Sequence, residues 1–234
     1  TCEYWRAANG VDSVNFDADA LTADVIIDAA GASSASIALG YGQDTVTLSA
    51  GTNTLTVGKA SGTDTFATNT LSSDDTLILT GGGTIDDLVF DGTTIKYAEG
   101  GATLAGAIAA VDNTGKLKVS TDDGKTSQMV AYTTATGKSL TASTDVDVYI
   151  GTGDTAITSA SDVNLYDTAK YKNISAGISV TGSGTFIGAK GAKTTINAAT
   201  ATDAVQIWGG STDANAIKLN AAGKKSDTVW FGTT

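Results

Sequence analysis

The chain has 234 residues, of which 17% are charged, with no His, no Pro and a formal net charge of −11. Without His, and with Cys2 as its single Cys, it excludes Ser–His and Cys–His nucleophile pairs and His-ligated metal sites. The acidic balance disfavours nucleic acid and anionic membranes as partners, and no stretch of the sequence has the length of a transmembrane helix.

Short units of alternating polar and apolar residues begin near residue 44 and define the fold class. Their first residues are Asp44, Asn53, Asp64 and Asp75, at separations of 9, 11 and 11 residues. The two-residue alternation predicts strands with one buried face, and the Gly- and Ser-rich segments between the units predict turns. Because the units resemble one another, an all-β parallel solenoid, either a β-roll or a β-helix, is favoured over a β-sandwich.

The middle of the chain breaks this rhythm. Leu104, Ile108 and Val111 have helical spacing, which predicts a short helix within 102–111. Residues 116–120 and 128–132 alternate around Asp122-Asp123-Gly124-Lys125, which predicts a β-hairpin. We therefore expect solenoid repeats over 1–97, a small inserted lobe over 98–141, and solenoid repeats again over 142–234.

The repeats return toward the end of the chain, with units starting at Asp203, Asn215 and Asp227. No capping segment is evident at either end, which predicts that more chain follows or that copies stack end to end. Four aromatic residues near the two ends are candidates for a self-assembly or binding surface, the alternative being core or cap residues. They are Trp5, Trp208, Trp230 and Phe231.

One segment carries a family resemblance. Residues 40–46 read Gly-Tyr-Gly-Gln-Asp-Thr-Val and fit most of the nonapeptide G-G-x-G-x-D-x-U-x, with a partial match at Gly62, Asp64 and Phe66. This pattern resembles the RTX proteins, a secreted bacterial family with calcium-binding β-rolls.

The resemblance implies Ca²⁺ as a cofactor, held by Gly-rich turns and aspartates on neighbouring rungs. Its candidate ligands in this sequence are Gly40, Gly42, Asp44, Gly62 and Asp64. Calcium needs six to eight oxygens, whereas no two complete nonapeptides follow one another here. The alternative is that these aspartates hydrogen-bond the backbone of turns.

These features predict a structural protein, not an enzyme: a subunit or segment of an extracellular bacterial surface layer, filament or adhesin that stacks on itself through solenoid ends. The alternative is an adhesin module that binds cell-surface carbohydrate or a host surface through the 98–141 lobe or the terminal aromatics. An acid-pair enzyme needs only two carboxylates, but none of the pairs Asp74-Asp75, Asp86-Asp87 and Asp122-Asp123 is singled out.

Overall fold

The computed structural model describes residues 3–97, 100–111, 115–132, 139–142, 147–150, 156–159, 163–167, 177–180, 184–187, 195–197, 205–209, 216–219 and 227–231. Beyond residue 132 we describe the pairing of backbone strands. The chain divides into two compact units. The first comprises Thr1–Val89, Thr93–Ala109 and Lys116–Met129, and the second comprises Phe90–Gly92, Ala110–Gly115 and Val130–Thr234.

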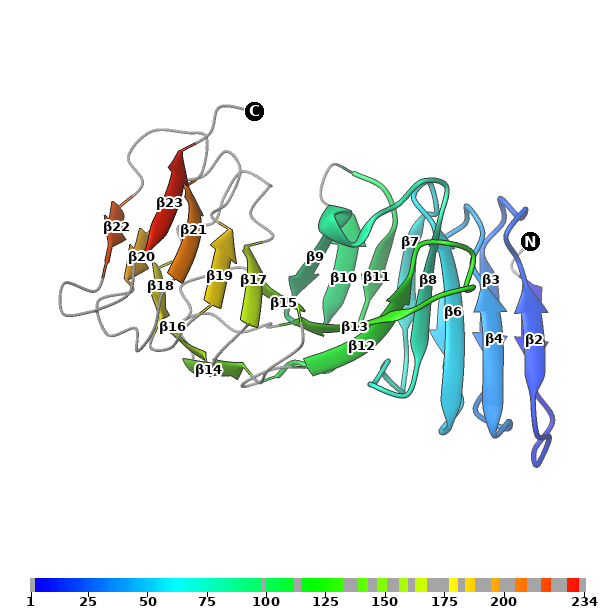
Figure 1. Ribbon diagram of the computed structural model, residues 1–234. Helices are drawn as coiled ribbons and strands as arrows, with labels where there is room; N and C mark the ends of the chain where they lie inside the picture. Colours follow the sequence, from blue (N-terminus) through cyan, green and yellow to red (C-terminus); the bar gives the residue numbers. More distant parts are fainter. Residues whose placement is uncertain are drawn as a thin grey trace. The chain divides into compact units, whose positions relative to one another are not determined.

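The strands of the first unit alternate between two parallel sheets (Figure 1). One sheet contains β1 (Glu3–Arg6), β3 (Val25–Asp28), β5 (Thr45–Thr47), β7 (Thr63–Phe66) and β11 (Thr103–Ala105), in that order. The other contains β2 (Val14–Asp17), β4 (Ser34–Ala38), β6 (Thr52–Gly58), β8 (Thr76–Thr80) and β12 (Gly115–Ser120). Each turn of the chain thus adds one strand to each sheet, which confirms the predicted all-β parallel solenoid.

The strand register gives the length of a rung. Paired residues are 22, 19 and 20 positions apart along β1, β3, β5 and β7, and 21, 18 and 22 apart along β2, β4, β6 and β8. Two of the sequence units therefore make one two-sided rung. Successive rungs place like residues above one another, as in Leu55 beside Leu77.

The core lies between the two sheets and follows the two-residue period of each strand. In β6 and β8 buried and half-buried positions alternate, and Leu55, Val57, Leu77 and Leu79 are all buried. The intervening Thr side chains lie on the outer face, where β-branched residues suit a half-exposed strand.

The rungs are interrupted once in the first unit, between β8 and β11. A single-turn 3₁₀ segment, η1 (Ile85–Asp87), is followed by β9 (Leu88–Asp91) and β10 (Thr94–Tyr97), and β10 pairs antiparallel with β11. Thr103 of β11 lies opposite Thr63 of β7, 40 residues earlier, which is twice the ordinary offset. The excursion therefore occupies the length of one rung, and parallel pairing resumes after it.

The helix expected within 102–111 is wrong. Residues 103–105 form β11 instead, parallel to β7, and no residue of 102–111 is helical. Gly101 and Gly106 have φ values of 141° and 78°, which do not belong to a right-handed helix. The apolar spacing that suggested a helix arises because Leu104 and Ile108 both enter the solenoid core.

The two strands expected after this segment are confirmed as β12 and β13 (Gln128–Tyr132). Between them, the Lys125 N–H donates to the Asp122 carbonyl at 3.3 Å, and Asp123 and Gly124 have φ values of 57° and 81°. Two consecutive positive φ values are typical of the tight turn that Asp-Gly favours. Because β11 and β12 pair with solenoid strands, this part of 98–141 belongs to the rungs, while the domain limits at 98 and 141 stay a prediction.

The second unit has the same alternation of parallel strands. One sheet contains β13, β15 (Asp147–Ile150), β17 (Val163–Asp167), β19 (Gly184–Ile187), β21 (Val205–Gly209) and β23 (Thr228–Phe231). The other contains β14 (Ser139–Ala142), β16 (Ala156–Ser159), β18 (Gly177–Val180), β20 (Thr195–Asn197) and β22 (Ala216–Lys218). Among the residues described, we find no helix with the length and apolarity needed to cross a bilayer.

Three glycines of the resemblance motif let successive turns stack closely. A Cβ on Gly62 would lie 2.0 Å from the Gly42 carbonyl oxygen, and one on Gly42 would lie 2.5 Å from that of Ala23. A Cβ on Gly40 would meet the carbonyl oxygens of Ala18 and Leu21 in the same way. A side chain at these positions would force the rungs apart.

We therefore predict that Gly62→Ala lowers the free energy of unfolding by about 1–3 kcal/mol, the usual cost of overpacking. The matched control is Gly58→Ala, because a Cβ there makes only ordinary contacts of 3.4 and 3.5 Å with hydroxyl oxygens. Chemical denaturation of both variants measures the difference. Equal losses in the two variants would contradict the close stacking at Gly62.

Candidate functional site

The four residues that open the repeats between 44 and 79 lie inside the solenoid. Asp44, Asn53, Asp64 and Asp75 are all exposed by 2% or less, although three of them carry a carboxyl group. By strand register Asp44 lies beside Asp64 in one sheet, and Asn53 lies beside Asp75 in the other. Each sheet therefore has a column of buried polar side chains where its strands begin.

In the first sheet the column links three rungs through side-chain to backbone hydrogen bonds. The Val25 N–H donates to Asp44 Oδ1 at 2.9 Å, and the Asp44 N–H donates to Asp64 Oδ1 at 3.0 Å. Each aspartate thus satisfies a backbone donor of the preceding rung. Such bonds satisfy buried amides that would otherwise be left without a partner.

The column in the second sheet is more completely bonded. Asp75 Oδ1 accepts hydrogen bonds from the backbone N–H and the side-chain Nδ2 of Asn53. Asp75 Oδ2 accepts from the Ser72 N–H at 2.7 Å and the Ser72 hydroxyl at 2.8 Å. Asn53 Oδ1 in turn accepts from the N–H and hydroxyl of Ser49. Both oxygens of Asp75 therefore have partners.

The first column differs because its two carboxyl groups keep an unused oxygen. Within the described residues, Asp44 Oδ2 and Asp64 Oδ2 are buried and have no hydrogen-bond partner. Burial away from water raises the pKa of Asp64 to about 7; the Asp44 N–H opposes this rise, and the Asp44 charge adds to it. Asp64 is consequently a buried acid that titrates near neutral pH.

The two free oxygens can be compared with the needs of a calcium ion. Calcium takes six to eight oxygen ligands, whereas Asp44 and Asp64 each commit one oxygen to the backbone and offer one more. The described residues contain no group of three or more acidic, Cys or His side chains placed to hold a metal. Calcium binding at Asp44 and Asp64, with Gly40, Gly42 and Gly62, stays a prediction.

The adjacent acid pairs take part in local structure. Asp75 belongs to the buried column, while its neighbour Asp74 is exposed. Asp87 Oδ2 accepts from the N–H and hydroxyl of Thr84, which caps η1. Asp122 accepts from the N–H and hydroxyl of Thr126, bonds that hold its pKa at about 2. These contacts account for one member of each pair without invoking a reaction.

The four aromatic residues singled out near the ends fall into both units. In the first, the Trp5 ring stacks on Phe16, with centroids 6.3 Å apart and 22° between the planes. In the second, Trp208 and Trp230 occupy paired register positions on β21 and β23, and Phe231 is paired with Gly209. Three of the four therefore lie on two neighbouring strands, while their role in assembly or binding stays a prediction.

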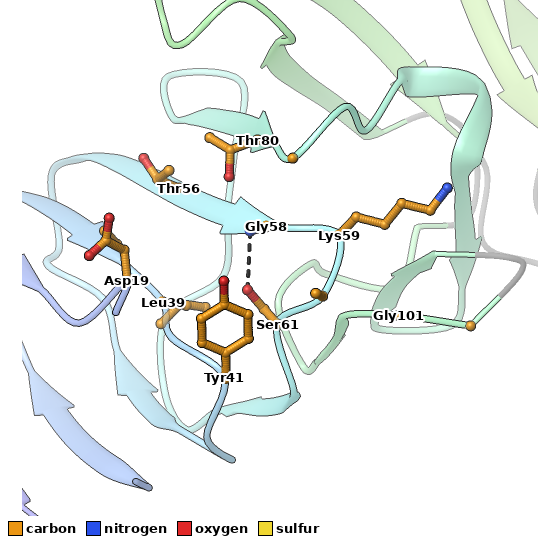
Figure 2. A pocket seen from close by; sticks show the side chains of 13 residues that line it. Asp19, Leu39, Tyr41, Thr56, Gly58, Lys59, Ser61, Thr80 and Gly101 are labelled. Atoms are coloured by element: carbon orange, nitrogen blue, oxygen red, sulfur yellow. Dashed lines mark hydrogen bonds between the residues drawn. The ribbon is translucent and has the colours of Figure 1, made fainter. Parts of the chain in front are cut away.

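A groove that the sequence did not indicate lies on the outer side of the first unit (Figure 2). Its volume is about 680 Å³, and its lining includes Asp19, Tyr41, Thr56, Lys59 and Thr80. Tyr41 lies within the resemblance motif, and its ring is 57% exposed. A large aromatic residue between two glycines of a turn is the feature of the sequence by which this site could have been found.

Comparison with known proteins does not assign the chain to a family, so a functional proposal has to rest on the fold and the candidate site. No protein-family model, curated protein or solved structure matches this chain. What the structure defines is a parallel β-solenoid with two strands per rung and buried aspartate and asparagine columns.

The raised pKa of Asp64 predicts that stability falls as pH rises. Between about pH 4 and pH 7 the folded protein keeps a proton on Asp64 that the unfolded chain releases, so the free energy of unfolding decreases through this window. The size of the effect is on the order of 4 kcal/mol, from about 1.4 kcal/mol for each pH unit. Thermal melts across the window measure the loss.

The variant Asp64→Asn separates this effect from other titrations. The amide keeps an oxygen that accepts the Asp44 N–H and carries no charge, so the melting temperature should decline less steeply between pH 4 and 7. Asp74→Asn, at an exposed carboxyl, is the control and should keep the wild-type profile. An unchanged pH profile in Asp64→Asn would show that Asp64 is not the titrating group. Running the same melts with and without excess Ca²⁺ tests the calcium prediction.

Proposed function

We propose that the chain is a structural segment of an extracellular bacterial assembly, a surface layer, filament or adhesin, whose partner is a second copy of itself. In this proposal a rung of the second copy adds to β1 and β2 by the parallel pairing that already joins neighbouring rungs. The proposal assigns no catalytic step to the chain.

The observation that carries the proposal is the incomplete burial of the first rung. Trp5 and Phe16 are only half-buried, whereas Ile27 and Ile37, the residues beside them on the next rung, are 0% and 1% exposed. The stacked aromatic pair therefore occupies core positions, but among the described residues a neighbouring rung covers it on one side only. One more rung would give these rings the environment that Ile27 and Ile37 have.

Within the described residues β1 and β2 are the outermost strands of their sheets, each with one neighbour, β3 and β4. Unpaired edges of this kind favour the addition of further strands. Parallel addition would continue the ladder without a change of geometry.

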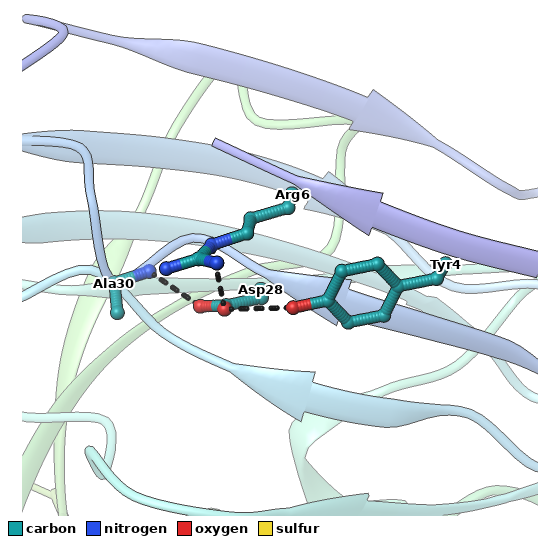
Figure 3. A network of polar contacts seen from close by, with 4 residues as sticks. All are labelled: Tyr4, Arg6, Asp28 and Ala30. Atoms are coloured by element: carbon teal, nitrogen blue, oxygen red, sulfur yellow. Dashed lines mark hydrogen bonds and ion pairs between the residues drawn. The ribbon is translucent and has the colours of Figure 1, made fainter. Parts of the chain in front are cut away.

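Side-chain contacts link the first rung to the second (Figure 3). On the outer face, Tyr4 and Arg6 of β1 both approach Asp28 of β3: the Tyr4 hydroxyl donates to Asp28 Oδ2 at 3.2 Å, and Arg6 Nε lies 3.5 Å from the same atom. The Ala30 N–H donates to the other oxygen at 3.1 Å. An exposed ion pair contributes little stability by itself, so these contacts mainly fix the position of β1.

The proposal predicts that the 234-residue chain associates in a concentration-dependent way and that Trp5→Lys weakens the association. Burying an aromatic side chain contributes about 1.5–3 kcal/mol, which corresponds to a roughly 10- to 100-fold change in the dissociation constant. Sedimentation velocity over a range of concentrations measures the constant, and negative-stain electron microscopy shows whether the assemblies are linear.

The matched control is Asn15→Lys, which changes an exposed residue of β2 on the same rung, next to Phe16. It should leave the association unchanged, and both variants should keep the wild-type circular dichroism spectrum. A wild-type chain that stays monomeric at every concentration, or equal weakening by the two variants, would overturn the proposal.

A further inference from the structure

The groove beside Tyr41 owes its depth to small residues on the outer face of one sheet. Ala38 of β4 pairs with Thr56 of β6, and Gly58 of β6 pairs with Thr80 of β8. Each hydroxyl-bearing position thus lies beside a position with a methyl group or no side chain. The result is a recess with a polar lining and a volume of about 680 Å³, within the range of small-molecule sites.

Tyr41 is held in place by its backbone while its ring stays open to solvent. Its N–H donates to the Leu21 carbonyl at 2.7 Å, and Gly40 and Gly42 on either side pack against the backbone of the preceding rung. The ring is nevertheless 57% exposed. In Figure 2 its hydroxyl end points toward β6, where the Ser61 hydroxyl accepts the Gly58 N–H at 3.1 Å. A fixed, exposed ring at the side of a recess offers a flat apolar surface at little entropic cost.

Several polar side chains of the lining are without a hydrogen-bond partner among the residues described. Within the described part of the chain, the Asp19 carboxylate and the hydroxyls of Thr56 and Thr80 make no hydrogen bond to another protein group. Asp19 is exposed and the two threonines are half-buried, so a ligand can reach all three. Binding it would break no hydrogen bond that these side chains make to the described residues. A carboxylate accepts hydrogen bonds, and a hydroxyl both donates and accepts.

We propose that this groove binds a neutral saccharide, with one sugar ring stacked on Tyr41 and sugar hydroxyls bonded to Asp19, Thr56 and Thr80. A sugar ring presents an apolar face of C–H groups and an edge of hydroxyls, which is the combination that this lining complements. Asp19 beside the ring and the net charge of −11 disfavour anionic sugars and phosphorylated ligands. In Figure 2 the Lys59 side chain extends away from the ring, so it does not offset Asp19 there.

This inference does not depend on self-assembly, because most of the groove is lined by residues of β4, β6 and β8 and of the turns beside them, and Asp19, two residues after β2, is the one lining residue of the first rung. The groove reaches the 98–141 lobe only at Gly100 and Gly101, and its lining contains none of the terminal aromatics. A variant that no longer associates should therefore still bind the saccharide, and a variant that no longer binds the saccharide should still associate.

The test starts with a glycan array of neutral and anionic oligosaccharides probed with the 234-residue chain. The strongest neutral glycan is then titrated by isothermal calorimetry against the wild type and three variants. Tyr41→Ala should weaken binding at least 10-fold, because the stacking surface is lost. Tyr41→Phe should stay within about threefold, because the ring remains, and Thr56→Val should weaken binding by removing one hydroxyl at nearly constant volume.

Tyr4→Ala is the matched control, since Tyr4 is 58% exposed but lies on β1 outside the groove. It should bind as the wild type does. An array on which no neutral glycan binds, or binding that Tyr41→Ala and Tyr4→Ala change equally, would overturn the proposal. Binding of anionic glycans alone would overturn it as well.

Discussion

The structure of the first unit depends on hydrogen bonds that buried Asp side chains accept from the backbone of the preceding rung. Parallel strands with similar alternation could pair in several registers, and a slip of one residue would turn every core side chain outward. The bonds that Asp44 accepts from the Val25 N–H and that Asp75 accepts from the Asn53 N–H remove this freedom, because a slip would leave a buried donor and a buried carboxylate without partners. The stacked glycines Gly42 and Gly62 set the rung spacing that these bonds require.

Asp75 and Asp64 make the same bond to the preceding rung, but they differ in whether their second carboxyl oxygen has a hydrogen-bond partner. Asp75 follows Ser72, whose N–H and hydroxyl occupy the second carboxylate oxygen. Asp64 follows Ser61 at the same spacing, but the Ser61 hydroxyl accepts the Gly58 N–H, and Asp64 Oδ2 is left without a partner. A small difference in the turn therefore decides whether a buried carboxyl group is fully bonded or titrates near neutral pH.

Much of the fold could be predicted from the sequence, because strand alternation and turn residues are local signals. The repeat spacing gave the parallel solenoid, and Asp123-Gly124 gave the turn before β13. The helix at 102–111 was wrong because Leu104 and Ile108 have a spacing that fits a helix as well as a strand–turn connection. The site was harder: the sequence put Asp44 and Asp64 on neighbouring rungs, but their burial follows only from the packing of the two sheets, and only pairing across rungs brings Ala38 and Gly58 together to open the groove at Tyr41.

The most direct test of this account is native-state hydrogen exchange of the backbone amides of Val25, Asp44 and Asn53, compared with amides of the exposed turn at Asp123-Gly124. If the buried side chains hold the rungs in register, the three amides should exchange only through global unfolding, with protection equal to the full free energy of unfolding. Exchange as rapid as that of the turn would contradict the account, because it would mean that the inter-rung bonds open while the rest of the solenoid stays folded.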